Sequence, residues 1–328
     1  SPRCSSAGHS RKPRSNHVTT RRLRLAVFIA YALAFVWAGF VYGLPTDRIA
    51  VLSWVLGGFI CGTVGRPRRI WITMSRDFGV FVAMWFAYDY SRGMADQLGF
   101  PVNHWLPRDV DRFLFFGNDP NVWMQRHFYE AASVRWYDVV GSMIYFTHFC
   151  VPMGLAVVLW IRNRDRWVQY MRRLATVLFL GVATFVVFPA APPWMVSKEG
   201  GMATLARPTV RGWQHLGLGT VSKVIERGRE VVNPVAAVPS LHVAFSLIVV
   251  LFFVKQMPKW LRPIVVIFPL SMMTTLVYFG EHFVFDGIMG VAYVLIAFRF
   301  WNIYERTPEG FRRAAARFLR DSAPKTNA

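Results

Sequence analysis

The stretch EHFVFDGIMGVAYVLIAFRFW, residues 281–301, joins several ionisable side chains to an apolar run of membrane-spanning length. After His282 its only charged side chains are Asp286 and Arg299. A helix of about 20 apolar residues crosses the hydrocarbon core of a bilayer, where ionisable groups are costly and usually functional. The stretch therefore predicts a transmembrane helix with a functional site at its start, where Glu281, His282 and Asp286 lie.

Further apolar runs of similar length occur along the whole chain. Of its 328 residues, 54% are hydrophobic and 17% are charged, whereas about a quarter of the residues in soluble domains are charged. The charges are confined to short blocks between the runs, as in polytopic membrane proteins. We therefore expect an all-α, polytopic membrane helix bundle with about eight transmembrane helices. The expected spans are residues 25–44, 49–65, 70–95, 137–161, 174–190, 236–254, 263–281 and 283–301.

The basic residues predict the orientation of these helices. The net charge is +20, but the basic residues cluster beside apolar runs without a nucleic-acid motif, so we expect no nucleic-acid partner. Cytoplasmic loops of membrane proteins are enriched in Lys and Arg. If both termini are cytoplasmic, about two thirds of the 38 basic residues lie on the cytoplasmic side. We expect a multi-pass protein of the cell membrane, with basic cytoplasmic tails at residues 1–24 and 302–328, the first of them disordered.

Two segments on the opposite side of the membrane are too long to be simple turns. Residues 97–136 mix aromatic and charged side chains, a composition typical of helices that lie at a membrane surface. Residues 191–235 begin with AAPPW and continue as a loop rich in Gly and Arg. Long loops in compact proteins are usually functional or disordered, and the same is expected of this loop.

No residue pattern predicts a metal, a cofactor or a disulfide. Cys4, Cys61 and Cys150 lack paired spacing, and we expect them to be free thiols. No cluster of Asp, Glu, Cys and His has the spacing of a metal site. His148 lies within an expected span with no second axial histidine at a matching position, which argues against haem.

Two of the expected helices begin with histidine-bearing motifs on the extracytoplasmic side. One begins VPSLHVAF and carries His242, and the other carries His282 and Asp286. Residues four apart share one face of a helix, so the carboxylate can orient the imidazole and leave its other nitrogen as a nucleophile. A second, protonated histidine can give a proton to a departing oxygen, and helix N-termini attract anions. The pattern predicts a phosphoryl-transfer site at the outer membrane surface.

Two other interpretations account for the same residues. A transporter or proton-coupled carrier would use His242, His282, Asp286 and Glu281 as a proton relay. Such a relay predicts polar groups that continue toward the bilayer midplane, whereas the stretches after His242 and Asp286 are almost wholly apolar. A membrane scaffold predicts that changing His282 has no consequence.

The motifs PSLH and HFVFD resemble the second and third signature motifs of the type-2 phosphatidic acid phosphatase superfamily, in particular its inositolphosphotransferase branch. That branch includes the inositol phosphorylceramide synthases. The resemblance covers residues 76–301 and implies a six-helix catalytic core preceded by two additional helices. It also implies that His282 attacks phosphorus, that Asp286 orients it, that His242 protonates the leaving group and that Ser240 hydrogen-bonds the phosphate.

The chain departs from the superfamily pattern in its phosphate-binding cations. The third motif's serine and arginine fall at Thr275 and Leu276. The first motif, in which six residues separate a lysine from an Arg-Pro pair, has no strict match. A phosphate still needs a positive ligand, and the candidates are Lys198, Arg207 and Arg211. Glu281 is the remaining candidate for the site, either as a base or as a ligand of acceptor hydroxyls.

These observations predict an integral membrane lipid phosphatase or phosphotransferase that acts at the extracytoplasmic face without a metal. A phosphohistidine would pass phosphate to water, or a headgroup such as phosphoinositol to an alcohol. The expected substrate is a phospholipid or a polyprenyl phosphate among the membrane lipids. The expected organisation is two additional helices at residues 25–69 and a catalytic membrane domain at residues 70–301. Nothing in the sequence indicates an oligomeric state.

Overall fold

The computed structural model describes residues 15–42, 48–93, 99–231 and 233–308. Within these ranges the chain is helical, without strands, and the expected all-α class is confirmed. The longer helices are α1 (Ser15–Tyr42), α2 (Arg48–Thr63), α3 (Arg68–Gly93), α6 (Trp136–Arg162), α7 (Arg164–Val187), α10 (Gly219–Val231), α11 (Leu241–Val254), α13 (Ile267–Tyr278) and α14 (Val284–Arg306). The shorter ones are α4 (Leu106–Leu114), α5 (Pro120–Phe128), α8 (Pro193–Lys198), η1 (Pro208–Val210), α9 (Arg211–His215) and α12 (Arg262–Val265).

The chain divides into two compact units, residues 1–86 and 87–328. In the first unit α1 packs against α2, and the rings of Tyr31 and Trp54 lie 5.5 Å apart. Helix α1 begins at Ser15, so part of the segment expected to be a disordered tail is helical. The remainder of that tail, and most of the C-terminal one, lie outside the described residues.

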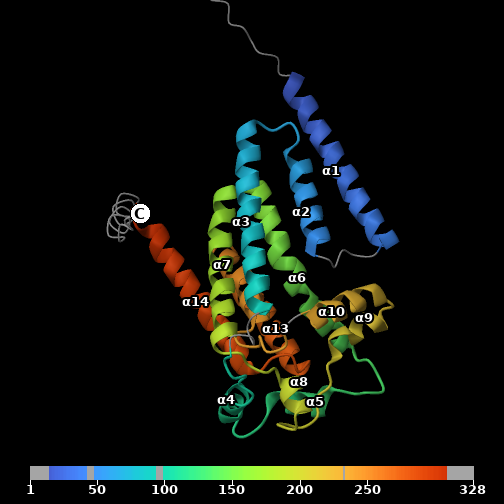
Figure 1. Ribbon diagram of the computed structural model, residues 1–328, viewed down its shortest axis with the longest axis vertical. Coiled ribbons are helices and arrows are strands. Elements are labelled where there is room, and N and C mark those ends of the chain that lie inside the picture. The colour runs from blue at the N-terminus through green and yellow to red at the C-terminus, as the bar shows by residue number, and fades with distance from the viewer. Residues whose placement is uncertain (1–14, 43–47, 94–98, 232, 309–328) are drawn as a thin grey trace, which may run out of the picture. The chain divides into compact units, whose positions relative to one another are not determined.

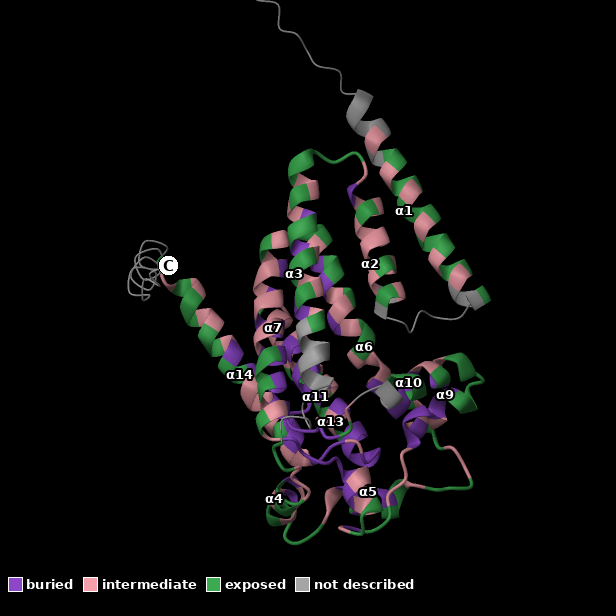
Figure 2. Cartoon of the chain, viewed as in Figure 1, coloured by how far each residue is buried: buried purple, intermediate pink, exposed green. Residues whose placement is uncertain are grey.

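The second unit is built around α11. This helix packs against α6, α7, α13 and α14, which are labelled in Figure 1. Its side chains Ala244 and Ile248 are fully buried, and buried residues gather around α11 and α13 (Figure 2). The surrounding helices expose large apolar side chains instead, among them Ile161, Leu270 and Ile296. An apolar exterior around a packed interior is expected of a helix bundle whose solvent is lipid.

Three helices of the described chain are long and apolar enough, by length and composition, to cross a membrane: α6, α7 and α14. Shorter apolar helices cover Leu52–Thr63, Leu241–Val254 and Arg262–Tyr278. Each of the eight expected spans contains helix, but the count of about eight crossings remains a prediction. The sixth expected span begins as helix only at Leu241, because Pro239 disfavours helical geometry in the residue before it.

Short helices lie in the two long segments that the sequence predicts to be extracytoplasmic. Helix α4 is amphipathic and exposes Phe113 while burying Pro107 and Asp111. Parallel β-bridges join Asn103 to Ala190, and Ala190 to Ala236, so three loop segments lie side by side. These bridges join the segments that precede α4, α8 and α11.

Candidate active site

The starts of α11 and α14 are held together by main-chain contacts. The N–H of Ser240, the residue that precedes α11, donates to the carbonyl of Asp286 over 2.8 Å. One turn further along α14, a Cβ on Gly290 would lie 2.6 Å from the Ser240 carbonyl oxygen. Only glycine permits so close a crossing of two backbones. The two histidine motifs are therefore brought together by helix packing.

His282 and Asp286 form a buried pair at the start of α14. The Nδ1 atom of His282 lies 3.0 Å from Oδ2 of Asp286, and the two residues are 7% and 0% exposed. The same carboxylate oxygen accepts a hydrogen bond from the N–H of Phe283 over 3.0 Å. A carboxylate at Nδ1 places the proton on that nitrogen, which leaves a lone pair on Nε2. This is the arrangement of an oriented nucleophile.

The free edge of His282 faces His242 on α11. Nε2 of His282 lies 3.3 Å from Nδ1 of His242, which allows one N–H to be shared between the two rings. Helix α6 forms the wall behind His242. The Tyr145 ring stacks on it at 5.2 Å between centroids, and the His148 ring lies at 4.0 Å. The sequence analysis considered His148 only as a haem ligand and argued against that role. In the structure it lies beside His242.

The N-terminus of α11 can receive an anion. The Oγ atom of Ser240 is buried and has no hydrogen-bond partner among the described residues. It stands beside the first-turn amides of a 14-residue helix, whose N–H groups and dipole attract negative charge. A buried hydroxyl without a partner is costly unless a ligand supplies one. Ser240 therefore remains a candidate for a hydrogen bond to a phosphate oxygen.

The N-terminus of α14 is closed to an anion. Its amides of Val284 and Phe285 donate to Oδ2 and Oδ1 of Asp111, each over 2.8 Å. Asp111 lies on α4 and is fully buried. Phosphate binding is therefore expected at the start of α11 and not at that of α14, because a carboxylate of the protein already accepts from two amides of α14.

Two amides of α5 fix the loop that precedes His282. The side-chain amide of Asn121 donates to the carbonyls of Val277, over 2.8 Å, and His282, over 3.0 Å. Gln125 donates to the carbonyls of Tyr278, over 2.8 Å, and Ala206, over 2.9 Å. These contacts join the segment carrying Arg207 to the segment carrying His282, and the rigid support they provide is what precise catalytic geometry requires.

Arg207 and Glu281 pair with each other. The guanidinium donates from Nε to Oε1 over 3.0 Å and from Nη2 to Oε2 over 2.8 Å. Its face lies 4.1 Å from the ring centroid of Trp194. A bidentate, stacked arginine has a fixed position. Of the three candidate cations, Arg207 is the one tied to the residue that directly precedes His282.

The other candidate cations have different surroundings. Arg211 donates from Nη2 to the carbonyls of Glu130 and Ser133, each over 2.6 Å. Lys198 is exposed at the end of α8. Leu276, at the position where the superfamily pattern has arginine, is fully buried in an apolar cluster with Phe279. The structure therefore brings together His282, Asp286, His242 and Ser240, and leaves the phosphate-binding cation to be proposed.

Several residues that support the site were not identified from the sequence. They are Asp111, Asn121, Gln125, Tyr145 and His148. Each acts on a residue far along the chain, so no local spacing marks it. Among the described residues no group of three or more His, Cys, Asp and Glu side chains could hold a metal ion. Metal independence and the absence of a cofactor remain predictions.

Comparison with known proteins places this site in a family. Residues 109–300 match the PAP2 superfamily, and the chain therefore belongs to it, which confirms the resemblance of the PSLH and HFVFD motifs. It is a membrane protein of the phosphatase and phosphotransferase class. The phosphoinositol dihydroceramide synthase of Bacteroides thetaiotaomicron is 23% identical over 314 residues, which cover 91% of this chain and 98% of that protein. No solved structure matches the chain.

Proposed function

We propose that this chain transfers a phosphorylated headgroup from a phospholipid to an alcohol, through a phosphohistidine on His282, at the extracytoplasmic face of the cell membrane. The observation that carries the proposal is the position of His282, whose Nδ1 lies 3.0 Å from Asp286 and whose Nε2 lies 3.3 Å from His242. The nucleophile thus contacts its orienting carboxylate through one ring nitrogen and its acid–base partner through the other.

In the first half-reaction, Nε2 of His282 attacks the phosphorus atom of the donor. The N–P bond forms as the bond between phosphorus and the lipid alkoxide breaks. His242, protonated, gives its proton to the departing oxygen. The charge that develops on the phosphoryl oxygens is stabilised by the Ser240 hydroxyl and the first-turn amides of α11.

In the second half-reaction, an alcohol takes the place of the departed lipid. His242, now neutral, accepts the hydroxyl proton while the alcohol oxygen attacks phosphorus. The N–P bond breaks and returns the electron pair to Nε2 of His282. Asp286 keeps the imidazole in the same tautomer throughout, because its carboxylate accepts from Nδ1 in both steps. Water in place of the alcohol would make the same site a phosphatase.

The charges near His282 favour a phosphodiester donor over a phosphomonoester. A monoester dianion requires more positive charge than a diester, which carries one negative charge. Leu276 stands where a further arginine is expected, and the charge of Arg207 is balanced by Glu281. A lipid with a phosphoinositol-type headgroup is a diester, in agreement with the name of the Bacteroides relative. The acceptor would then be a lipid alcohol of the ceramide type.

The test is transfer by the purified protein in lipid micelles without added metal. It is offered a panel of headgroup-labelled phospholipids and polyprenyl phosphates, with and without a lipid alcohol. We expect labelled product to depend on the alcohol. His282→Ala should lower the rate by about 10³-fold or more, and Asp286→Asn by about 10²-fold or more, because the nucleophile and its orientation are lost.

The matched control is His215→Ala, which removes an exposed histidine of α9. It should retain the wild-type rate. Acid-labile, alkali-stable label on the wild-type protein, absent from His282→Ala, would identify the phosphohistidine. If His282→Ala transfers as fast as wild type, the phosphohistidine mechanism is wrong. Proton-coupled substrate uptake by reconstituted vesicles, without any transfer product, would favour the transporter alternative.

A further inference from the structure

A carboxylate outside the histidine motifs holds the first turn of the catalytic helix. Asp111 of α4 lies fully buried between α4 and α14, although it belongs to an amphipathic surface helix. Both of its oxygens accept hydrogen bonds, Oδ2 from the N–H of Val284 and Oδ1 from that of Phe285. The contacts join residues more than 170 positions apart. A fully buried carboxylate is unfavourable unless hydrogen bonds compensate for the lost water. The amides of α14 supply these hydrogen bonds.

The amides that Asp111 holds determine where Asp286 lies. Val284 and Phe285 are the two residues directly before Asp286 in the first turn of α14. The side chain of Asp286 spans the same turn, because Oδ2 accepts from the N–H of Phe283 and also contacts Nδ1 of His282. A shift of this turn changes the distance between the carboxylate and the imidazole. Displacements of about 1 Å are enough to lower catalytic rates about 10²-fold.

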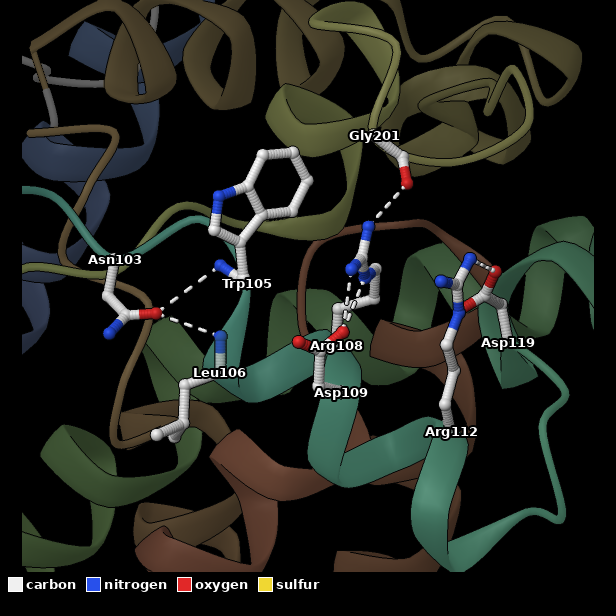
Figure 3. Close-up of polar contacts among 8 residues, drawn as sticks. All are labelled: Asn103, Trp105, Leu106, Arg108, Asp109, Arg112, Asp119 and Gly201. Carbon is white, nitrogen blue, oxygen red and sulfur yellow. Dashed lines mark hydrogen bonds and ion pairs between the residues drawn. The ribbon is translucent and has the colours of Figure 1, made fainter.

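Helix α4 is itself fixed, so it can act as a rigid support (Figure 3). Oδ1 of Asn103 accepts from the N–H of Leu106 over 2.9 Å, at the start of the helix. Arg108 donates to the carbonyl of Gly201 over 2.7 Å. Arg112, near the helix end, forms a bidentate pair with Asp119 at 2.7 and 2.8 Å. Contacts at both ends and to the loop after α8 keep Asp111 in one place.

We propose that Asp111 is a positioning residue of the transfer reaction, which holds the first turn of α14 so that Asp286 stays aligned with His282. Its ionised form is the working form, since only a carboxylate accepts fully at both oxygens. The proposal goes beyond the phosphotransferase assignment, on which its kinetic part rests.

The ionisation of Asp111 falls within an accessible pH range. Burial raises the pKa of its carboxyl to about 7, against the two amide hydrogen bonds, which lower it. The charges of Asp286 and Asp119 raise the pKa further. Arg112 faces Asp119 and balances its charge. Below pH 7 a proton on Asp111 removes one acceptor from the α14 turn, so transfer activity should fall as the pH decreases through this value.

The experiment compares Asp111→Asn with wild type and with Asp109→Asn. The asparagine keeps the shape and one acceptor oxygen, and Asp109 is an exposed aspartate of the same helix. In Asp111→Asn we expect kcat to fall about tenfold, KM to stay within about twofold, and the acid limb of the pH profile to change, because the protonation of His282 alone then sets the loss of activity. Asp109→Asn should keep the wild-type kcat and pH profile. Unchanged kcat together with an unchanged acid limb in Asp111→Asn would overturn the proposal.

A second readout separates this proposal from the transferase assignment. The imidazole of His282 is titrated by NMR in protein with isotopically labelled histidine, and its signal is assigned from its absence in His282→Ala. If Asp111 positions Asp286, Asp111→Asn shifts the His282 titration and Asp109→Asn leaves it unchanged. This result would support the positioning role even if wild type transferred no lipid headgroup. A His282 titration identical in wild type and Asp111→Asn would overturn the role whatever the activity.

Discussion

The main-chain N–H of Ser240 donates to the carbonyl of Asp286 over 2.8 Å, so the start of α11 is tied to the first turn of α14. The contact depends on the close crossing of the two helices, at which Gly290 lies against the Ser240 carbonyl. His242 lies two residues after Ser240, and Asp286 holds His282. The distance between the two histidines is therefore set by backbone packing, and not only by their own contact.

Gly290→Ala should disrupt this crossing. The added Cβ would lie 2.6 Å from a backbone oxygen, which cannot move aside as a flexible side chain could. We expect a loss of about 1–3 kcal/mol in unfolding free energy and a fall in transfer activity of at least tenfold. Thermal unfolding in detergent and the transfer assay measure the two effects.

Gly154→Ala is the control for that substitution. Gly154 also lies within a long helix, α6, but a Cβ there meets nothing within 4 Å. The same change should leave activity unaltered and add up to about 1 kcal/mol of stability through helix propensity. If both variants behave alike, the close approach at Gly290 is not what positions the histidines.

Much of this arrangement could be predicted from the sequence because its determinants are local. Apolar runs of membrane length indicated the helices, and the four-residue spacing of His282 and Asp286 indicated a shared helical face. The pairing with His242 followed from the orientation expected of the helices. The sixth span was expected to start at residue 236, whereas α11 starts at Leu241. An apolar run does not show that the loop continues through Pro239 and Ser240.

The supports of the site could not be predicted, because they depend on contacts between distant segments. Asp111 and Asn121 meet backbone atoms more than 150 residues away, and nothing beside them in the chain marks that role. The sequence also left Lys198, Arg207 and Arg211 as equal candidates for the phosphate cation. The fold distinguishes them, since the side chain of Arg207 is paired with Glu281, the neighbour of His282.

Glu281→Gln should widen the range of phosphate charge that the enzyme accepts. The change preserves the side-chain shape but leaves the charge of Arg207 uncompensated, which favours a dianion. We expect the ratio of activity on phosphatidic acid to activity on a phosphodiester lipid to rise about tenfold. Both substrates carry the same acyl chains in the assay, and inhibition by inorganic phosphate should strengthen in parallel.

Glu226→Gln serves as the matched variant, because Glu226 is an exposed glutamate of α10. It should leave the ratio at the wild-type value. An unchanged ratio in Glu281→Gln, with activity retained on the diester, would show that Glu281 does not set the charge preference. The transferase assignment would be unaffected by that result.

The expected orientation can be tested with two exposed lysines. Lys198 is the last residue of α8, a helix whose Trp194 N–H donates to the carbonyl of Gly280 in the loop before His282. Lys259 lies in the connection between α11 and α12. Ser240 is unsuitable for labelling because it is fully buried. In a chain with Cys4, Cys61 and Cys150 replaced by serine, an impermeant maleimide should label Lys198→Cys in intact cells. Lys259→Cys should react only after permeabilisation, and the reverse pattern would place the site on the cytoplasmic side.

The stability of the protein should depend on pH through Asp111 in the direction opposite to its activity. The pKa of this carboxyl is raised by burial from 3.8 to about 7, so the folded state binds the proton more tightly than the unfolded state. The contribution of protonated Asp111 to stability is fully present below pH 4 and is lost as the pH rises to about 7. A shift of this size corresponds to a few kcal/mol, on the order of 1.4 kcal/mol per pKa unit.

Asp111→Asn removes the titration, so the stability of wild type relative to this variant should decrease between pH 4 and pH 7. Thermal unfolding in a non-ionic detergent measures the difference, in which the titration of other groups cancels, and Asp109→Asn should show no such trend. A difference between wild type and Asp111→Asn that stays constant across this range would mean that Asp111 titrates outside it.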